Sequence, residues 1–177
     1  MNNEYEKINS ASINRAEEEH PGSKDKIISA QKTMPVDIIN LCKAFDDISV
    51  FVSTGLPKVI SGAIHKTKDG FAILCNGNEP ETRQRFTLAH ELAHYLLHYN
   101  SLKLKGDYPE NVLLRGGLTN QQEVEANKLA ASILMPFGAI NKYIETRGGD
   151  FRIKDMASFF SVSTPAMAIR LGIPMDI

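Results

Sequence analysis

The sequence contains little of what marks secreted or membrane proteins. Its only cysteines, Cys42 and Cys75, lie far apart in apolar stretches, which predicts buried free thiols rather than a disulfide or a cysteine metal site. No apolar run approaches the ~20 residues that span a bilayer. The polar N-terminus has no apolar stretch typical of a secretory signal. We therefore expect a cytoplasmic protein.

An excess of charge of either sign is also missing. The 177 residues include 20 Lys and Arg and 21 Asp and Glu, which leaves a formal net charge of −1. A surface that binds nucleic acid or anionic lipid needs a clear positive excess, so we expect neither kind of partner. The length suits one domain with a substantial hydrophobic core.

Hydrophobic periodicity predicts the secondary structure. Short β-rich runs cover 48–53, 59–64 and 71–75, and a turn at 68–70 predicts an antiparallel hairpin between the last two. Helical patterns cover 24–32, 36–45, 83–99, 119–135, 137–146, 153–160 and 166–171. We predict an α+β fold in which a small antiparallel sheet of about three strands packs against the central helix and surrounding helices.

The chain divides into three predicted segments. Residues 1–22 are polar and end at Pro21-Gly22, which indicates a disordered or loosely docked leader with at most one short helix. Residues 23–150 form the predicted core domain, and 151–177 a C-terminal helical extension packed on it. Residues 100–118 read as a long loop, of the kind that covers or lines a cleft.

The central helix carries an H-E-x-x-H pattern from His90 to His94. The two histidines lie one helical turn apart on one face, where both imidazoles can bind a single Zn²⁺. Glu91 is rotated by about 100° from His90 and can reach a water on that metal as a general base. The remaining faces are apolar, so the helix should be buried. Chance occurrence of the pattern, or a purely structural histidine pair, is the alternative.

A third ligand must come from another element. His98 lies two turns from His90, about 12 Å along the helix axis, too far for all three histidines to share one ion. The 119–135 helix offers Glu123 and Glu125. Helical geometry puts Glu123 at the centre of an apolar face of small residues and Glu125 on the polar face. We therefore expect Glu123 to be the ligand; the alternative is an ordinary carboxylate at a helix start.

Asn127 follows Glu123 by one turn on the same helix. An amide at this position can hydrogen-bond a ligating side chain and fix its orientation. A donor is also needed for the oxyanion of peptide hydrolysis. His98 and Tyr95 are the nearby candidates for that donor or for a supporting role; His98 can equally be structural, and Tyr95 can face the core.

Two segments together resemble a known family. RQRFTLAHELAHYLLH, followed by EVEANKLAASILMP, is similar to the ImmA/IrrE metallopeptidases, gluzincin-like enzymes with H-E-x-x-H and a downstream E-x-x-A-N. The resemblance covers about residues 25–172. It implies a zincin-like core, His90, His94 and Glu123 as metal ligands, and Glu91 as catalytic base. It also implies a site-specific protease that cleaves a helix-turn-helix repressor, an anti-repressor of a mobile element or a stress response.

The predicted reaction is metal-assisted peptide hydrolysis. Zn²⁺ is the expected cofactor, although Mn²⁺ and Fe²⁺ suit the same ligands. The first alternative is a non-cleaving regulatory module that sequesters a repressor or another partner protein. The second is a DNA-binding protein, because 153–167 resembles a helix-turn-helix half. Its basic residues are few (Arg152, Lys154 and Arg170), so we expect no direct contact with nucleic acid.

Overall fold

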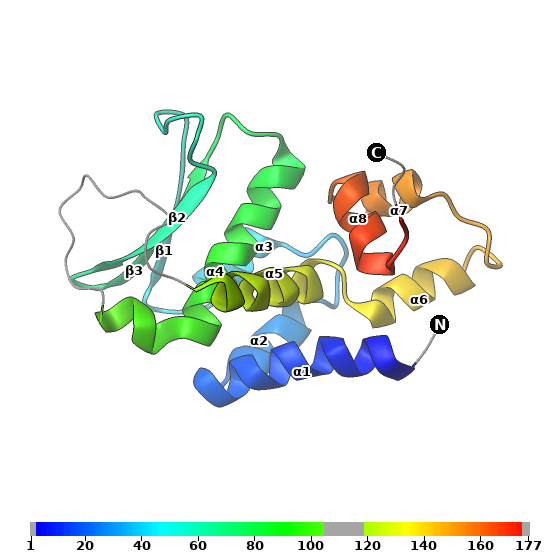
Figure 1. Cartoon of the computed structure of the whole chain (residues 1–177), viewed down its shortest axis with the longest axis horizontal. Helices are drawn as coiled ribbons and strands as arrows, with labels where there is room; N and C mark the ends of the chain where they lie inside the picture. Colours follow the sequence, from blue (N-terminus) through cyan, green and yellow to red (C-terminus); the bar gives the residue numbers. More distant parts are fainter. Residues whose placement is uncertain (1–2, 105–118, 175–177) are drawn as a thin grey trace.

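The computed structural model describes residues 3–104 and 119–174. Its sheet has the order β1-β3-β2, from β1 (Ile48–Ser53), β2 (Gly62–Thr67) and β3 (Gly70–Asn76). Helix α4 (Glu81–Leu104) lies between this sheet and α5 (Asn120–Leu134) (Figure 1). The predicted α+β class and the packing of a small sheet on a central helix are confirmed.

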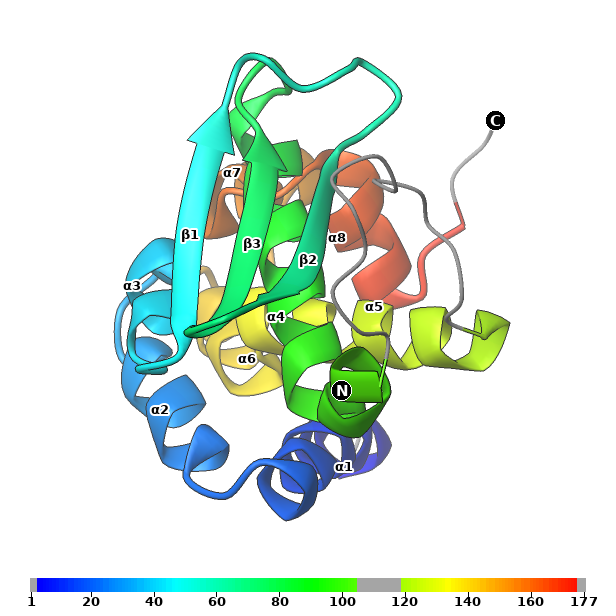
Figure 2. The same ribbon diagram turned by 90° about the vertical axis from the view of Figure 1, so that its left-hand side faces the viewer.

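The sheet is mixed rather than antiparallel. Strands β2 and β3 form the predicted antiparallel hairpin, with Ile64 opposite Ile73. Strand β1 pairs with β3 in parallel, with Val50 opposite Ile73. The segment 54–61 carries the chain past the position that β3 later fills, so β3 becomes the central strand (Figure 2). The prediction of a wholly antiparallel sheet was wrong, because the turn at 68–70 indicates the pairing direction of its two flanking strands only and not that of β1.

Helix α4 forms the centre of the molecule. Apolar residues surround it, and Leu88, Ala89, Leu92, Ala93 and Leu96 are at most 2% exposed. The helix is interrupted at His98, whose φ of −129° and ψ of 26° are not helical, and it continues to Leu104. The sequence predicted an unbroken helix to residue 99 and a loop from residue 100. Of that predicted loop, 105–118 lies outside the described residues.

Helix α5 packs on α4 opposite the sheet. Its start is a capping box, in which the Thr119 side chain accepts from the Gln122 backbone N–H and the Gln122 side chain binds back to the Thr119 backbone. Ala126 and Ala130 are fully buried, so the two helices approach closely. This packing brings Glu123 to α4.

The N-terminal segment differs from the predicted leader. Residues 3–19 form α1 (Asn3–Glu19), which packs on α4 and α5 (Figure 1). Ile13 and Ala16 are 5% and 0% exposed and belong to the main core. The sequence predicted at most one short helix here, whereas α1 has 17 residues, because polar and charged residues make up most of the stretch. The next helices are α2 (Ser23–Ala30) and α3 (Ile38–Lys43).

Three helices follow α5: α6 (Phe137–Glu145), α7 (Ile153–Phe160) and α8 (Thr164–Leu171). Met156, Phe160 and Met167 are fully buried and continue the same hydrophobic core. Cys42 and Cys75 are free and buried, as predicted. Within the described part of the chain, no helix combines the length and apolar character needed to cross a membrane.

Candidate metal centre

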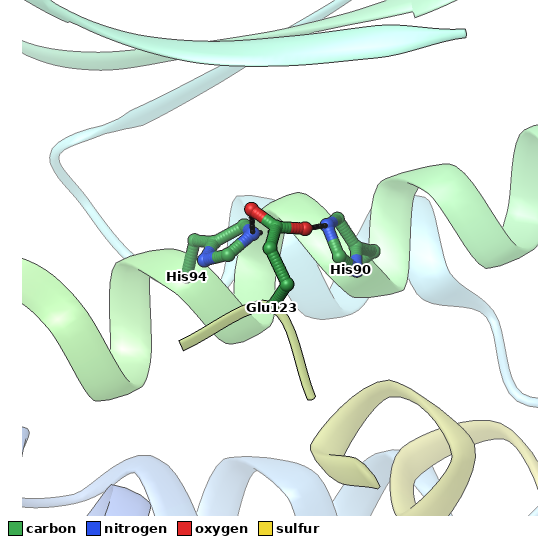
Figure 3. A group of neighbouring side chains, drawn as sticks. All are labelled: His90, His94 and Glu123. Carbon is green, nitrogen blue, oxygen red and sulfur yellow. Dashed lines mark hydrogen bonds and ion pairs between the residues drawn. The ribbon is translucent and has the colours of Figure 1, made fainter. Parts of the chain in front are cut away.

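Two histidines of α4 and one glutamate of α5 direct their side-chain ends at one another (Figure 3). The Nε2 atoms of His90 and His94 lie 2.9 Å apart. Oε2 of Glu123 lies 3.3 Å from His90 Nε2, and Oε1 of Glu123 lies 3.4 Å from His94 Nε2. Donor atoms from three side chains and two helices therefore surround one point.

The spacing of these atoms fits a metal ion. Bonds of about 2.0–2.2 Å at tetrahedral angles place ligand atoms roughly 3.3 Å apart, close to the three distances found here. Two imidazoles and a carboxylate are also a known ligand set of catalytic zinc, with a fourth position left for water. His90, His94 and Glu123 could thus hold a metal ion.

Asn127 contacts one of the histidines, as the sequence predicted. Its Oδ1 lies 3.0 Å from Nδ1 of His90. Because an amide oxygen only accepts, Nδ1 of His90 carries the proton and Nε2 keeps a lone pair. That lone pair points toward the cluster, which is the orientation that a metal ligand needs.

The exposure of the three side chains is uneven. The side chain of His94 is 3% exposed and that of His90 is 18% exposed, whereas that of Glu123 is 44% exposed. Glu123 was expected in the middle of an apolar face; Ala130 and Leu134 of that face are buried, but the Glu123 side chain itself is more exposed than such a position suggests. Its first-turn position on α5 leaves one side of the carboxylate in solvent. The cluster is therefore reached by water from the Glu123 side.

Glu91 lies beside the cluster without belonging to it. It is 9% exposed and is not one of the three residues whose donor atoms converge. Strand β2 passes close by, because a Cβ added to Gly62 would stand 3.8 Å from Cγ of Glu91. The Glu91 side chain thus lies close to the edge strand of the sheet, on the same helical turn as the histidines.

His98 connects the cluster to a second carboxylate. Its Nδ1 lies 3.1 Å from Nδ1 of His94, and its Nε2 lies 3.1 Å from Oε2 of Glu125. The other oxygen of Glu125 forms an ion pair of 2.7 Å with Arg15 of α1. This Arg15 hydrogen bond is the main reason that the pKa of Glu125 falls to about 2, so the carboxylate is ionised. Glu125 is only 17% exposed, although the sequence placed it on a polar face.

The sequence profile of the IrrE N-terminal-like domain, a peptidase family, matches residues 61–172, which is more than half of the chain. The chain belongs to the IrrE N-terminal-like family. It therefore carries a metallopeptidase-type domain, and its His-His-Glu group agrees with that type. The expected resemblance to ImmA/IrrE metallopeptidases is confirmed.

A solved structure supports the fold of this IrrE-like domain. The protein is described as a Mycobacterium tuberculosis transcriptional regulator, with a TM-score of 0.59 and 16% identity. The alignment covers 97% of this chain and 53% of that one, so this chain spans about half the length of the regulator. Comparison with curated proteins gives no significant match.

Tyr95 of the IrrE-like domain does not face the cluster. Its ring is 1% exposed, and its hydroxyl donates to Oδ1 of Asp47 at 2.6 Å and lies 2.6 Å from Nε2 of His20. Burial and the Asp47 contact raise the pKa of Tyr95. Burial also lowers the pKa of His20. Of the two alternatives for Tyr95, a donor at the site or a core residue, the structure shows the core residue, because its direction around the helix leads into the aromatic core.

Two residues near the site escaped the sequence analysis. Arg15 lies in a segment read as a leader, and no local pattern marks it. The sequence could have indicated Gly62, because an isolated glycine within a strand often marks a close approach of another backbone or ligand. A Cβ at Gly62 would overlap Cγ2 of Thr87 on α4. Only a glycine therefore lets β2 lie this close to the helix.

Proposed function

We propose that this chain is a zinc-dependent endopeptidase that cleaves a helix-turn-helix repressor at specific sites. The observation that carries the proposal is the convergence of His90, His94 and Glu123 beside the buried carboxylate of Glu91. A helix pair that only needed to be stable would have little reason to bring three metal-ligating groups together at a water-accessible point. Membership of a peptidase family supports the same reading.

In the proposed site, His90, His94 and Glu123 hold the metal and Glu91 is the general base. When bound, Zn²⁺ polarises the scissile carbonyl and lowers the pKa of a water toward neutrality. Glu91 accepts a proton from the attacking water and passes it to the leaving amine. Asn127 holds the His90 imidazole in its ligating orientation through the 3.0 Å contact.

We propose that the substrate lies along β2 as an additional strand. Both β1 and β2 are edge strands, but β2 packs against α4 and passes Glu91 at Gly62. Among the described residues β2 pairs with β3 alone, so backbone groups on its other edge can pair with an extended peptide and present its carbonyl to the site. Compact helices of a repressor must therefore unfold locally before cleavage, which favours one or a few exposed segments.

Direct DNA binding receives no support from the C-terminal helices. The Arg170 guanidinium donates to the Met135 backbone oxygen at 3.0 Å and stacks 4.0 Å over the Phe137 ring. Arg152 pairs with Asp155 at 2.7 Å. These two arginines are committed to contacts within the protein, so the segment has few cations for phosphates.

The test is incubation of the zinc-loaded protein with a helix-turn-helix repressor encoded beside it, followed by mass spectrometry of the products. We expect one or a few defined cuts with the unaltered protein and the same cuts about 10²–10⁴-fold more slowly with Glu91→Gln. Tight binding with no cleavage under Zn²⁺, Mn²⁺ or Fe²⁺ would favour the sequestering module instead. Cleavage of casein at many sites would contradict the proposed specificity.

A further inference from the structure

An unbroken line of polar contacts leads from the candidate metal centre to the N-terminal helix. It runs from His94 to His98 at 3.1 Å, from His98 to Glu125 at 3.1 Å, and from Glu125 to Arg15 at 2.7 Å. His94 and His98 belong to α4, Glu125 to α5 and Arg15 to α1. Both histidine side chains are 3% exposed, so water competes little for these bonds. Three helices that are separate in the sequence therefore meet in one chain of contacts.

The Glu125 carboxylate, the acceptor at the end of these contacts, determines the direction of each hydrogen bond before it. A carboxylate paired with a guanidinium only accepts, so Nε2 of His98 donates to Glu125. A neutral imidazole that donates from Nε2 accepts at Nδ1, and Nδ1 of His94 is the atom that donates to it. His94 then keeps its lone pair on Nε2, which is the atom that faces Glu123 and His90.

We propose that Glu125 and Arg15 are positioning residues that hold His94, through His98, in the tautomer whose Nε2 can ligate a metal. The inference rests on the proposed metal centre. Partners of this kind outside the ligand shell typically change metal affinity by about 10–100-fold. Gln121 also donates to Oε1 of Glu125 at 3.0 Å, so loss of Arg15 alone leaves Glu125 partly held. Glu125 should therefore matter more than Arg15.

The two ligating histidines have different partners at Nδ1, although their Nε2 atoms lie 2.9 Å apart. Nδ1 of His90 contacts Asn127, whereas Nδ1 of His94 contacts His98. A change at Arg15 or Glu125 should therefore alter the tautomer of His94 more than that of His90, whose Nδ1 keeps its contact with Asn127. His90 is thus an internal reference, and a general loss of structure would move both.

The test compares Arg15→Met, Arg15→Lys, Glu125→Met and a matched control, Arg152→Met. The control also removes an arginine from a 2.7 Å carboxylate pair, but this pair lies at the start of α7 and includes no residue of the metal cluster or of the contacts that lead from it. Imidazole ¹⁵N spectra of the metal-free proteins at about pH 8, where an ordinary histidine is neutral, report the tautomer of each ring. Competition with a zinc chelator measures metal affinity.

We expect His94 to be protonated at Nδ1 in the unaltered protein and to become a tautomer mixture in Glu125→Met. Zinc affinity should fall by about 10–100-fold in Glu125→Met and by less in Arg15→Met, with recovery in Arg15→Lys. Arg152→Met should change neither. An unchanged His94 tautomer in Glu125→Met, or an equal change at His90, would overturn the inference. Failure of the unaltered protein to bind zinc would overturn the proposed function instead, and the tautomer spectra would still decide this inference.

Discussion

Gly62 of β2 and Thr87 of α4 are in such close contact that no side chain fits between the two elements. A Cβ at Gly62 would overlap Cγ2 of Thr87 and stand 2.7 Å from the Leu74 carbonyl oxygen. The same approach brings β2 beside Glu91. The absence of a side chain at one strand position therefore sets the distance between the proposed substrate edge and the catalytic helix.

Gly62→Ala should destabilise the fold by about 1–3 kcal/mol, because the added methyl group overpacks the contact between β2 and α4. Urea unfolding measures the change. Gly138→Ala in α6 is the control, since a Cβ there meets nothing within 4 Å. Alanine in a helix should make that variant slightly more stable. Equal stability of Gly62→Ala and the unaltered protein would show that β2 can move away freely.

Metal analysis of purified variants should distinguish the three proposed ligands from Glu125, the neighbouring carboxylate that is not a ligand. His90→Ala, His94→Ala and Glu123→Ala should each lose the metal, because each removes a donor atom from the cluster. Glu125→Ala should retain one metal per chain when zinc is in excess, although it binds more weakly. Retention of full affinity in Glu123→Ala, with loss in Glu125→Ala, would exchange the roles of the two glutamates.

The ion pair of Glu125 should make part of the stability depend on pH. The Arg15 hydrogen bond holds the pKa of Glu125 at about 2, below its ordinary value of 4.5. Because the folded-state pKa is the lower one, this contribution is present above about pH 4.5 and is lost as the pH falls toward about 2. Glu125→Gln should therefore lower the stability near neutral pH and less so near about pH 3.

Chemical denaturation at several pH values checks this dependence. Glu145→Gln is a suitable control, because Glu145 lies exposed at the end of α6. The control should follow the pH profile of the unaltered protein. A Glu125→Gln profile parallel to that of the unaltered protein at every pH would contradict the ion-pair assignment.

Local patterns in the sequence predicted the parts of the fold that depend on local interactions. The turn at 68–70 predicted the β2–β3 hairpin, and one-turn spacing brought His90 and His94 together. The helical-face argument selected Glu123 over Glu125, and Asn127 contacts a histidine as expected. Each of these depends on residues a few positions apart, where backbone geometry alone limits the outcome.

Contacts between distant segments could not be predicted in the same way. The parallel pairing of β1 with β3, and the Arg15–Glu125 ion pair, join residues that no periodicity relates. No glycine or proline in the sequence of α4 marks the break at His98. His98 adopts the irregular backbone while bonded on both sides, to His94 and Glu125, so tertiary contacts accompany a conformation that propensity does not predict.

Glu91→Gln tests the central claim most directly. The substitution removes the proton acceptor and keeps the shape of a side chain that is 9% exposed and is not in the three-residue ligand group. We expect the variant to fold and to bind one zinc ion as the unaltered protein does. Its rate of peptide-bond hydrolysis, measured on the same repressor with both proteins loaded with zinc, should fall by about 10²–10⁴-fold. An unchanged rate in the metal-loaded variant would contradict the assignment of Glu91 as the general base.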